Sequence, residues 1–256
     1  DNNPPQIGNI CEATIVKKLN GGVARAKTKD QTILSIRGVP QKIKPHSKVN
    51  IIITSDKFDD KPVQAKILSQ DLTNLIGLND IQRIIKLYFN EKLPIIEDDY
   101  AIYWDLFDLD NIFLSALKPK IELKEGGVLW IEKTKAATLI DVDTSNLQLN
   151  SDEANLDFCK KVFMKCIEEI KLRNIGGMII IDFPRVPFQS RKNLNEYILK
   201  IGKEYFSDGS FLGFSRLQLY ELYIPRNFAP LESFYKDDKD FEFRNYIRSL
   251  WRKSKE

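Results

Sequence analysis

The chain has 256 residues, 43% of them hydrophobic and 29% charged, and a formal net charge of +3. These values are ordinary for a soluble globular protein with one large domain or two small ones. No apolar run approaches the roughly 20 residues that cross a bilayer, and residues 1–5 do not resemble a signal peptide. We therefore expect a cytoplasmic protein without a membrane segment.

The cysteine and histidine content limits the chemistry. Cys11, Cys159 and Cys166 show no C-x-x-C spacing, so we expect reduced thiols, no disulfide scaffold and no zinc site. His46 is the only histidine, which argues against Ser/His/Asp, Cys/His and paired-histidine mechanisms. Acid–base or metal chemistry must therefore use carboxylates, lysine, tyrosine or water.

Residues 1–70 are predicted to form an OB-like RNA-binding module of short strands joined by Gly/Pro turns. The expected strands are 9–16, 23–26, 32–36, 49–54 and 63–68. Within residues 1–57, lysine and arginine outnumber acidic residues, which favours phosphate binding. The same segment has no Phe, Tyr or Trp, so a base-stacking platform is not expected there, and a solvated basic surface is an equally good interpretation.

Residues 71–125 are predicted to be a helical connecting segment. Apolar spacing from Ile76 to Tyr88 suits an amphipathic helix with Asn79 or Asp80 near its start. A second helix is expected at 109–117, before Pro119.

Residues 126–226 alternate between strand and helix patterns and are predicted to form the catalytic core. The expected strands are 127–132, 137–143, 178–183 and 211–216, and the expected helices are 152–173 and 191–206. This order predicts a mixed or parallel sheet with packed helices. Residues 227–256 are expected to be a basic C-terminal tail with a last helix near 240–251.

Two apolar strands of this core carry aspartates at their carboxyl ends. Asp141 follows Leu139-Ile140, and Asp182 follows Ile180-Ile181. Ligands bind at the carboxyl ends of strands in open α/β sheets, so neighbouring strands would bring the two carboxylates together. Asp143 lies two positions after Asp141 and therefore shares its face, with Cα atoms roughly 6.5–7 Å apart.

Crowded carboxylates repel, and a hard divalent cation relieves the repulsion. Mg²⁺ prefers oxygen ligands and bridges carboxylates to substrate phosphates, and Mn²⁺ is a second candidate. The alternative is structural, because an aspartate after a strand is a common helix cap or turn former. Two such aspartates on matching strand ends, with a third at i+2, make the metal interpretation about as probable as the structural one.

Three sequence blocks resemble the ribonuclease E/G family. Residues 126–144, GGVLWIEKTKAATLIDVDT, are similar to the family pattern GGx[LI]xI[DEN]xTEA[LM]xxID[VI]N[ST]. Residues 172–183, LRNIGGMIIIDF, resemble LRD[LI]GG[LI]I[VI]IDF. Residues 215–222, SRLQLYEL, resemble SR[FL]GL[LV]E[ML]. The blocks occur in family order.

The resemblance implies an α/β (α+β overall) fold with an RNase H-like core of mixed or parallel sheet and packed helices, preceded by an OB-like barrel. It implies a metal-dependent endoribonuclease that hydrolyses phosphodiester bonds of single-stranded RNA in RNA processing or decay. Asp141 and Asp182 fall on the family's metal-binding aspartates. Asp143 falls where the family has a metal-site asparagine, and Arg216 is placed near the RNA backbone. Arg185, Arg191 and Lys192 follow the Asp182 strand and are candidate phosphate contacts, or solvated loop charges.

The chain also departs from the family pattern. It lacks the family's C-x-x-C zinc link, so no zinc-bridged assembly is expected, and the oligomeric state stays open. The short segment before Gly126 has no match to the family's pocket for a 5′ monophosphate. Asp143 and the reduced size therefore favour an alternative, an inactive RNA-binding or ribosome-associated protein that retains the fold.

Overall fold

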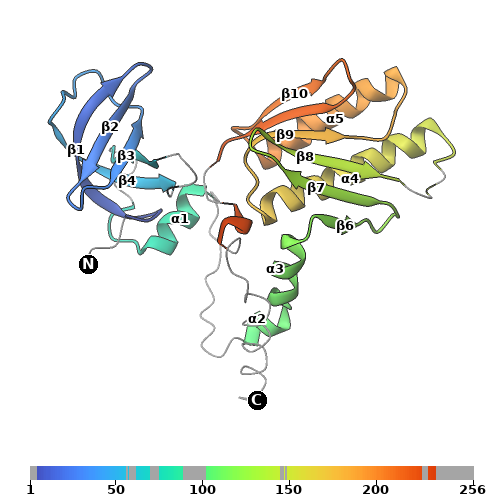
Figure 1. Cartoon of the computed structure of the whole chain (residues 1–256), viewed down its shortest axis with the longest axis horizontal. Coiled ribbons are helices and arrows are strands. Elements are labelled where there is room, and N and C mark those ends of the chain that lie inside the picture. The colour runs from blue at the N-terminus through green and yellow to red at the C-terminus, as the bar shows by residue number, and fades with distance from the viewer. Residues whose placement is uncertain are drawn as a thin grey trace. The chain divides into compact units, whose positions relative to one another are not determined.

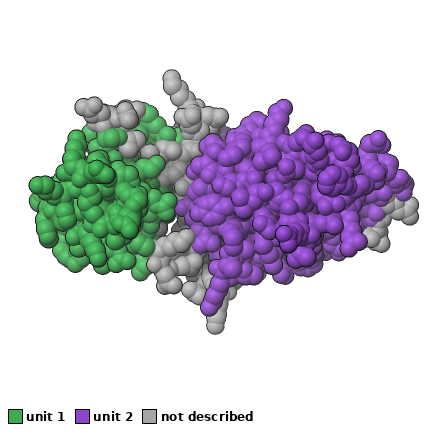
Figure 2. Space-filling model, turned by 90° about the horizontal axis from the view of Figure 1, so that it is seen from above, with its two compact units in different colours: residues 1–97, 227–229 green, residues 98–226, 230–256 purple. Residues whose placement is uncertain are grey.

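A computed structural model describes residues 5–55, 57, 62–69, 75–88, 102–144, 147, 149–226 and 230–234. They fall into two compact units, one within residues 1–97 and one within residues 98–226 and from 230 onward (Figures 1 and 2). The predicted basic tail and its helix near 240–251 lie outside the described residues, apart from 230–234. In this described part of the chain, no helix combines the length and apolar character needed to cross a membrane.

The first unit contains a closed barrel whose strands hydrogen-bond in the order β1-β2-β3-β5-β4, with β1 also paired to β4 (Figure 1). Alternate side chains such as Ile15, Leu34 and Ile53 fill its interior. The predicted OB-like barrel is therefore confirmed. Its strands are β1 (Ile10–Leu19), β2 (Val23–Thr28), β3 (Ile33–Arg37), β4 (Lys48–Ser55) and β5 (Val63–Ile67).

Helix α1 (Asp80–Tyr88) follows the barrel and begins where it was predicted to, at Asn79 or Asp80. Asn79 fixes this start, because its Oδ1 accepts a hydrogen bond from Gln82 N at 2.8 Å, while Gln82 Oε1 accepts from Asn79 N at 3.1 Å. This reciprocal pair is a capping box. Arg83 Nη1 donates to the Gly8 carbonyl at 3.4 Å and ties the helix to the residues that lead into β1.

The second unit is built on a sheet with the strand order β10-β11-β9-β8-β7-β6 (Figure 1). Only β8 and β9 pair in parallel, so the predicted mixed sheet is confirmed. Its strands are β6 (Lys120–Glu122), β7 (Val128–Lys133), β8 (Ala137–Asp143), β9 (Gly177–Asp182), β10 (Ser210–Phe214) and β11 (Tyr220–Ile224). The helices are α2 (Ile102–Leu106), α3 (Leu109–Leu117), α4 (Asp152–Leu172), α5 (Phe188–Tyr205) and the 3₁₀ turn η2 (Leu231–Phe234).

Helices α4 and α5 cover one face of this sheet, as Figure 1 shows. Ile140 of β8, Ile181 of β9 and Leu222 of β11 point to that face and pack with Phe163 and Leu194 of the helices. Burying each such side chain contributes about 1.5–3 kcal/mol. Because side chains alternate along a strand, the residues between them point to the opposite face, which we call the open face.

Both ends of α4 are capped. Ser151 Oγ accepts a hydrogen bond from Ala154 N at 3.1 Å and caps the N-terminus. At the C-terminus Asn174 takes a left-handed conformation with φ of 51°, and Ile175 N donates to the Ile170 carbonyl at 2.9 Å. This is a Schellman motif in which asparagine takes the place usually held by glycine.

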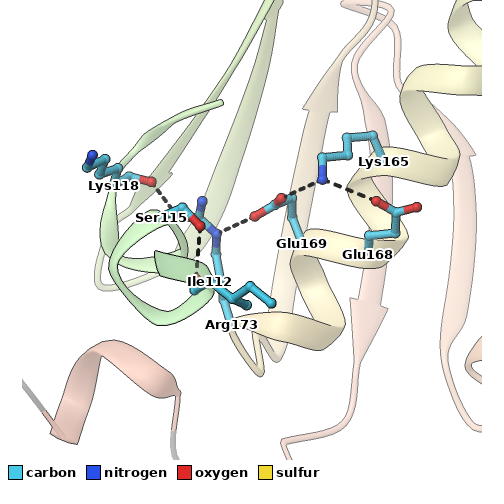
Figure 3. Close-up of polar contacts among 7 residues, drawn as sticks. All are labelled: Ile112, Ser115, Lys118, Lys165, Glu168, Glu169 and Arg173. Atoms are coloured by element: carbon cyan, nitrogen blue, oxygen red, sulfur yellow. Dashed lines mark hydrogen bonds and ion pairs between the residues drawn. The ribbon is translucent and has the colours of Figure 1, made fainter. Parts of the chain in front are cut away.

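A buried ion pair holds the end of α4 to the segment before β6 (Figure 3). Arg173 Nε lies 2.8 Å from Glu169 Oε2, and Arg173 Nη1 donates to the Lys118 carbonyl at 2.7 Å. Lys165 lies 3.0 Å from the other Glu169 oxygen and 3.1 Å from Glu168 Oε2. Arg173 is thus a structural residue that links α4 to the chain after α3.

Gly202 allows α5 to lie against β10, and its replacement by alanine is expected to destabilise the protein. A Cβ atom at this position would lie 2.3 Å from two ring carbons of Phe211. Overpacking costs about 1–3 kcal/mol, which exceeds the roughly 0.8–1.0 kcal/mol that alanine gains over glycine in a helix. Urea denaturation of Gly202→Ala and of the parent measures the net change in the free energy of unfolding.

The matched control for Gly202→Ala is the double variant with Phe211→Leu, which makes room for the new methyl group. We expect the double variant to lose less stability than the sum of the two single losses. A Gly202→Ala protein as stable as the parent would show that moving Phe211 aside costs no more than the roughly 0.8–1.0 kcal/mol that alanine gains in the helix.

Candidate active site

Asp141 and Asp182 lie side by side on the two central strands of the second unit. The parallel register of β8 and β9 pairs Asp141 with Asp182. Adjacent strands are about 4.7–4.9 Å apart, so the two carboxylates start from neighbouring backbone positions. The predicted adjacency of these aspartates is confirmed.

Both carboxylates point to the open face. Ile140, Val142 and Ile181, which flank them in sequence, are buried against the helices, whereas Asp141 and Asp182 are exposed. A shift of either strand by one residue would turn its aspartate into the core. The apolar alternation of β8 and β9 therefore fixes where the acidic pair is displayed.

The environment of Asp182 disfavours its ionised form. Partial loss of hydration raises the pKa of its carboxyl group, and the neighbouring Asp141 carboxylate raises that pKa further. Two carboxylates in this arrangement can be relieved by a proton or by a cation that both of them bind. The donor set therefore suits a hard divalent metal ion.

Asp143 is on the same face as Asp141 but farther along β8. It lies opposite Val128 of β7, one side-chain period beyond the last paired position of β8 and β9. Across the described ranges no three His, Cys, Asp or Glu side chains gather closely enough to hold a metal ion. The structure thus brings two of the three predicted ligands together and places Asp143 beyond the end of β9.

A hollow of about 240 Å³ adjoins Asp182. The loop after β9, the start of α5 and the turn between β10 and β11 enclose it. Its polar side chains are Asp182, Arg185, Arg191 and Gln218, and Phe183 and Phe214 contribute the aromatic part. Arg191 Nε is buried and has no hydrogen-bond partner in the described part of the structure. An acidic group and two guanidinium groups therefore share one cavity.

The other predicted phosphate contacts lie near this hollow but do not line it. Arg216 is exposed in the β10–β11 turn, directly before Leu217, which is a lining residue. Lys192 is exposed on α5, one position after Arg191. Sequence reasoning missed Phe214 and Gln218, because they depend on a turn between two strands of which only β10 was predicted.

The barrel carries a second, broader hollow of about 1260 Å³. Glu12 forms an ion pair of 2.9 Å with Lys48, and hydrogen bonds from Thr28 and Thr32 lower the pKa of Asp30. Cations outnumber these two acidic groups, so the surface suits phosphate, but none of its lining residues is aromatic. The basic side chains that line it are Lys27, Lys29, Lys48 and Arg83.

Comparison with known proteins places the barrel and the sheet in one family. A model described as "Ribonuclease E/G family" matches residues 15–226, from β1 to the end of β11. The chain belongs to the ribonuclease E/G family. The match covers both the OB-like barrel and the sheet that carries Asp141 and Asp182, so the family architecture spans the two units.

Individual relatives are ribonucleases of this family. Ribonuclease G of Haemophilus influenzae is 29% identical over 163 residues, which cover 58% of this chain and 32% of the relative. Ribonuclease G of Escherichia coli K12 is 33% identical over 133 residues, 50% of this chain and 27% of the relative. Ribonuclease E of Synechocystis is 33% identical over 139 residues, 54% of this chain and 19% of the relative. The chain thus spans no more than about a third of these ribonucleases.

Proposed function

We propose that this ribonuclease E/G family chain is a metal-dependent endoribonuclease that hydrolyses phosphodiester bonds of single-stranded RNA. The observation that carries the proposal is the register of β8 and β9, which sets Asp141 beside Asp182 on the open face. The relatives named above are ribonucleases, and the family match includes both strands. This supports the same class of reaction at the same pair of carboxylates.

Asp141 and Asp182 would hold one Mg²⁺ ion, or Mn²⁺ in its place. Two carboxylates supply hard oxygen ligands. Partial burial and the neighbouring Asp141 carboxylate both raise the pKa of Asp182, and a bound cation would relieve both effects. When bound, such an ion activates water and stabilises the charge of the phosphoryl transition state. Asp143, farther along the same face, is proposed to orient water at the metal site.

Arg185 and Arg191 are proposed to hold RNA phosphates beside the metal site. They line the same hollow as Asp182, and guanidinium groups bind phosphate oxygens through paired hydrogen bonds. Arg216 in the adjoining turn and Lys192 on α5 would add charge at the rim. The basic hollow of the barrel would hold a further part of the RNA electrostatically, so binding should weaken as the salt concentration rises.

The test is cleavage of an end-labelled single-stranded RNA in Mg²⁺, in Mn²⁺ and in EDTA. We expect internal cuts with either metal and none in EDTA, with a fully paired RNA of the same sequence cut more slowly. Undiminished cleavage in EDTA would contradict the role of the metal. RNA binding without cleavage in both metals would instead support the inactive RNA-binding alternative.

A further inference from the structure

Trp130 lies in one row with the two aspartates. The antiparallel register of β7 and β8 pairs Trp130 with Asp141, and the parallel register of β8 and β9 pairs Asp141 with Asp182. The three residues therefore occupy equivalent positions on three successive strands. Neighbouring strands lie about 4.7–4.9 Å apart, so the backbone of Trp130 is one strand spacing from that of Asp141.

The strand pattern directs Trp130 to the open face. Leu129 and Ile131, on either side of it, are buried against the helices, whereas Trp130 is 37% exposed. It does not belong to the hydrophobic core beneath the sheet. The exposed part of the indole is available to a ligand, and aromatic side chains in single-strand binders stack on bases.

Other aromatic side chains near Asp182 are already engaged. Phe183 and Phe214 both pack edge-on against the buried Tyr220, with ring centroids 6.3 and 5.0 Å away. The basic hollow of the barrel has no aromatic lining residue. Single-strand binders usually combine cations with aromatic platforms for the bases, because stacking is tolerant of sequence. Trp130 is placed to provide such a platform at the acidic pair.

We propose that Trp130 stacks on the base of the nucleotide that lies next to the phosphate at Asp141 and Asp182. The proposal rests on the proposed function, since it takes the carboxylate pair as the place where the RNA phosphate lies. Trp130 is a binding residue in this account and takes no part in proton transfer or metal ligation. Stacking of this kind tolerates any base, because every base presents an aromatic face.

The test measures RNA binding in an Asp182→Asn background, which keeps the substrate intact. Loss of a stacked base weakens binding by about 5- to 100-fold, so we expect that loss for Trp130→Leu and a smaller one for Trp130→Phe. Tyr223→Leu is the matched control. Tyr223 is 42% exposed on the same face, but it pairs with Met178, four positions before Asp182. We expect Tyr223→Leu to bind RNA as tightly as the parent.

RNA carrying a single abasic residue identifies the stacked base. With Trp130 present, one abasic position should weaken binding about as much as Trp130→Leu does. With Trp130→Leu, the same abasic RNA should show no further loss, because the two changes remove one interaction. Losses that add up, or a Trp130→Leu protein that binds as tightly as the parent, would overturn the inference. If the parent chain binds RNA through Trp130 yet never cleaves it, the endoribonuclease proposal fails and the stacking site stands.

Discussion

Replacing Asp182 by asparagine is expected to lower the rate of RNA cleavage by about 100-fold or more. A metal ion at a phosphoryl site contributes several kcal/mol to transition-state stabilisation, and each 1.36 kcal/mol corresponds to tenfold in rate. The asparagine side chain would offer a neutral oxygen in place of a charged ligand. Asp141→Asn should show a loss of the same order. Cleavage rates at saturating Mg²⁺ measure both effects.

The same substitution should make the metal-free protein slightly more stable. The pKa of Asp182 is raised in the folded state, so its carboxyl group supports folding below the ordinary pKa and opposes it once the pH exceeds the raised value. At neutral pH the substitution replaces an ionised carboxylate, which is partly buried and lies beside Asp141, with a neutral amide. We therefore expect Asp182→Asn to melt at a higher temperature in EDTA, and Mg²⁺ to raise the melting temperature of the parent more than that of the variant.

Two further aspartates serve as controls. Asp208 is exposed in the turn before β10, and Asp208→Asn should leave the cleavage rate unchanged. Asp143→Asn introduces the asparagine of the family pattern and is expected to keep activity. This result would show that the negative charge at position 143 is not required for cleavage. If Asp182→Asn cleaves RNA as fast as Asp208→Asn does, the proposed metal ligands are wrong.

The second large effect is on stability. Arg173→Met is expected to lower the free energy of unfolding by about 3–5 kcal/mol, because it breaks a buried ion pair and leaves the Glu169 carboxylate dependent on the more exposed Lys165. The Arg173 side chain is 10% exposed and that of Glu169 only 6%. The substitution also removes the donor to the Lys118 carbonyl. Urea denaturation, fitted with a common slope for parent and variant, measures the loss.

The partners of Arg173 provide the controls (Figure 3). Lys165, whose side chain is 34% exposed, is better solvated, so Lys165→Met should cost about 1 kcal/mol or less. The double variant Glu169→Leu with Arg173→Met removes both buried charges and should recover much of the stability lost in the single variant. A loss below about 1 kcal/mol for Arg173→Met alone would mean that Lys165 and water together compensate the remaining Glu169 carboxylate, and would contradict a structural role for the Arg173 ion pair.

Local periodicity predicts much of this fold. The barrel strands, β8, β9, α3 and α4 lie close to the expected ranges, because each carries a clear alternation or helical repeat. α5 begins at Phe188, directly after Pro187 at the N-cap position. The predicted start, Arg191, lies three positions later. β6 has only three residues and is defined by its pairing with β7, so no local pattern indicates it.

Strand β11 was missed although its sequence carried a signal. Tyr220, Leu222 and Ile224 alternate with more exposed residues, as expected of a strand with one buried face. Its antiparallel position between β9 and β10 depends on contacts between distant segments, which single-sequence patterns do not contain. The hollow beside Asp182 depends on the same turn and was therefore not predictable.

The candidate site was predictable only in part. The position of Asp141 and Asp182 on apolar strands indicated their proximity, but the register that pairs them is a property of the whole sheet. Asp143 is expected to join them because it shares a face with Asp141, but β9 ends at Asp182, two positions before Pro184, so no residue of β9 lies beside Asp143. Trp130 could be placed in the same row only after the register of β7 was known.

The parallel pairing of β8 and β9 also determines when the acidic pair can form during folding. Parallel neighbours need a crossover connection, and here the chain must pass through the whole of α4 before β9 can lie beside β8. Such contacts between distant segments form slowly, because loop closure costs entropy before pairing is gained. A nascent chain that stops short of β9 carries Asp141 without its partner, so the two-carboxylate centre can form only after β9 has been synthesised.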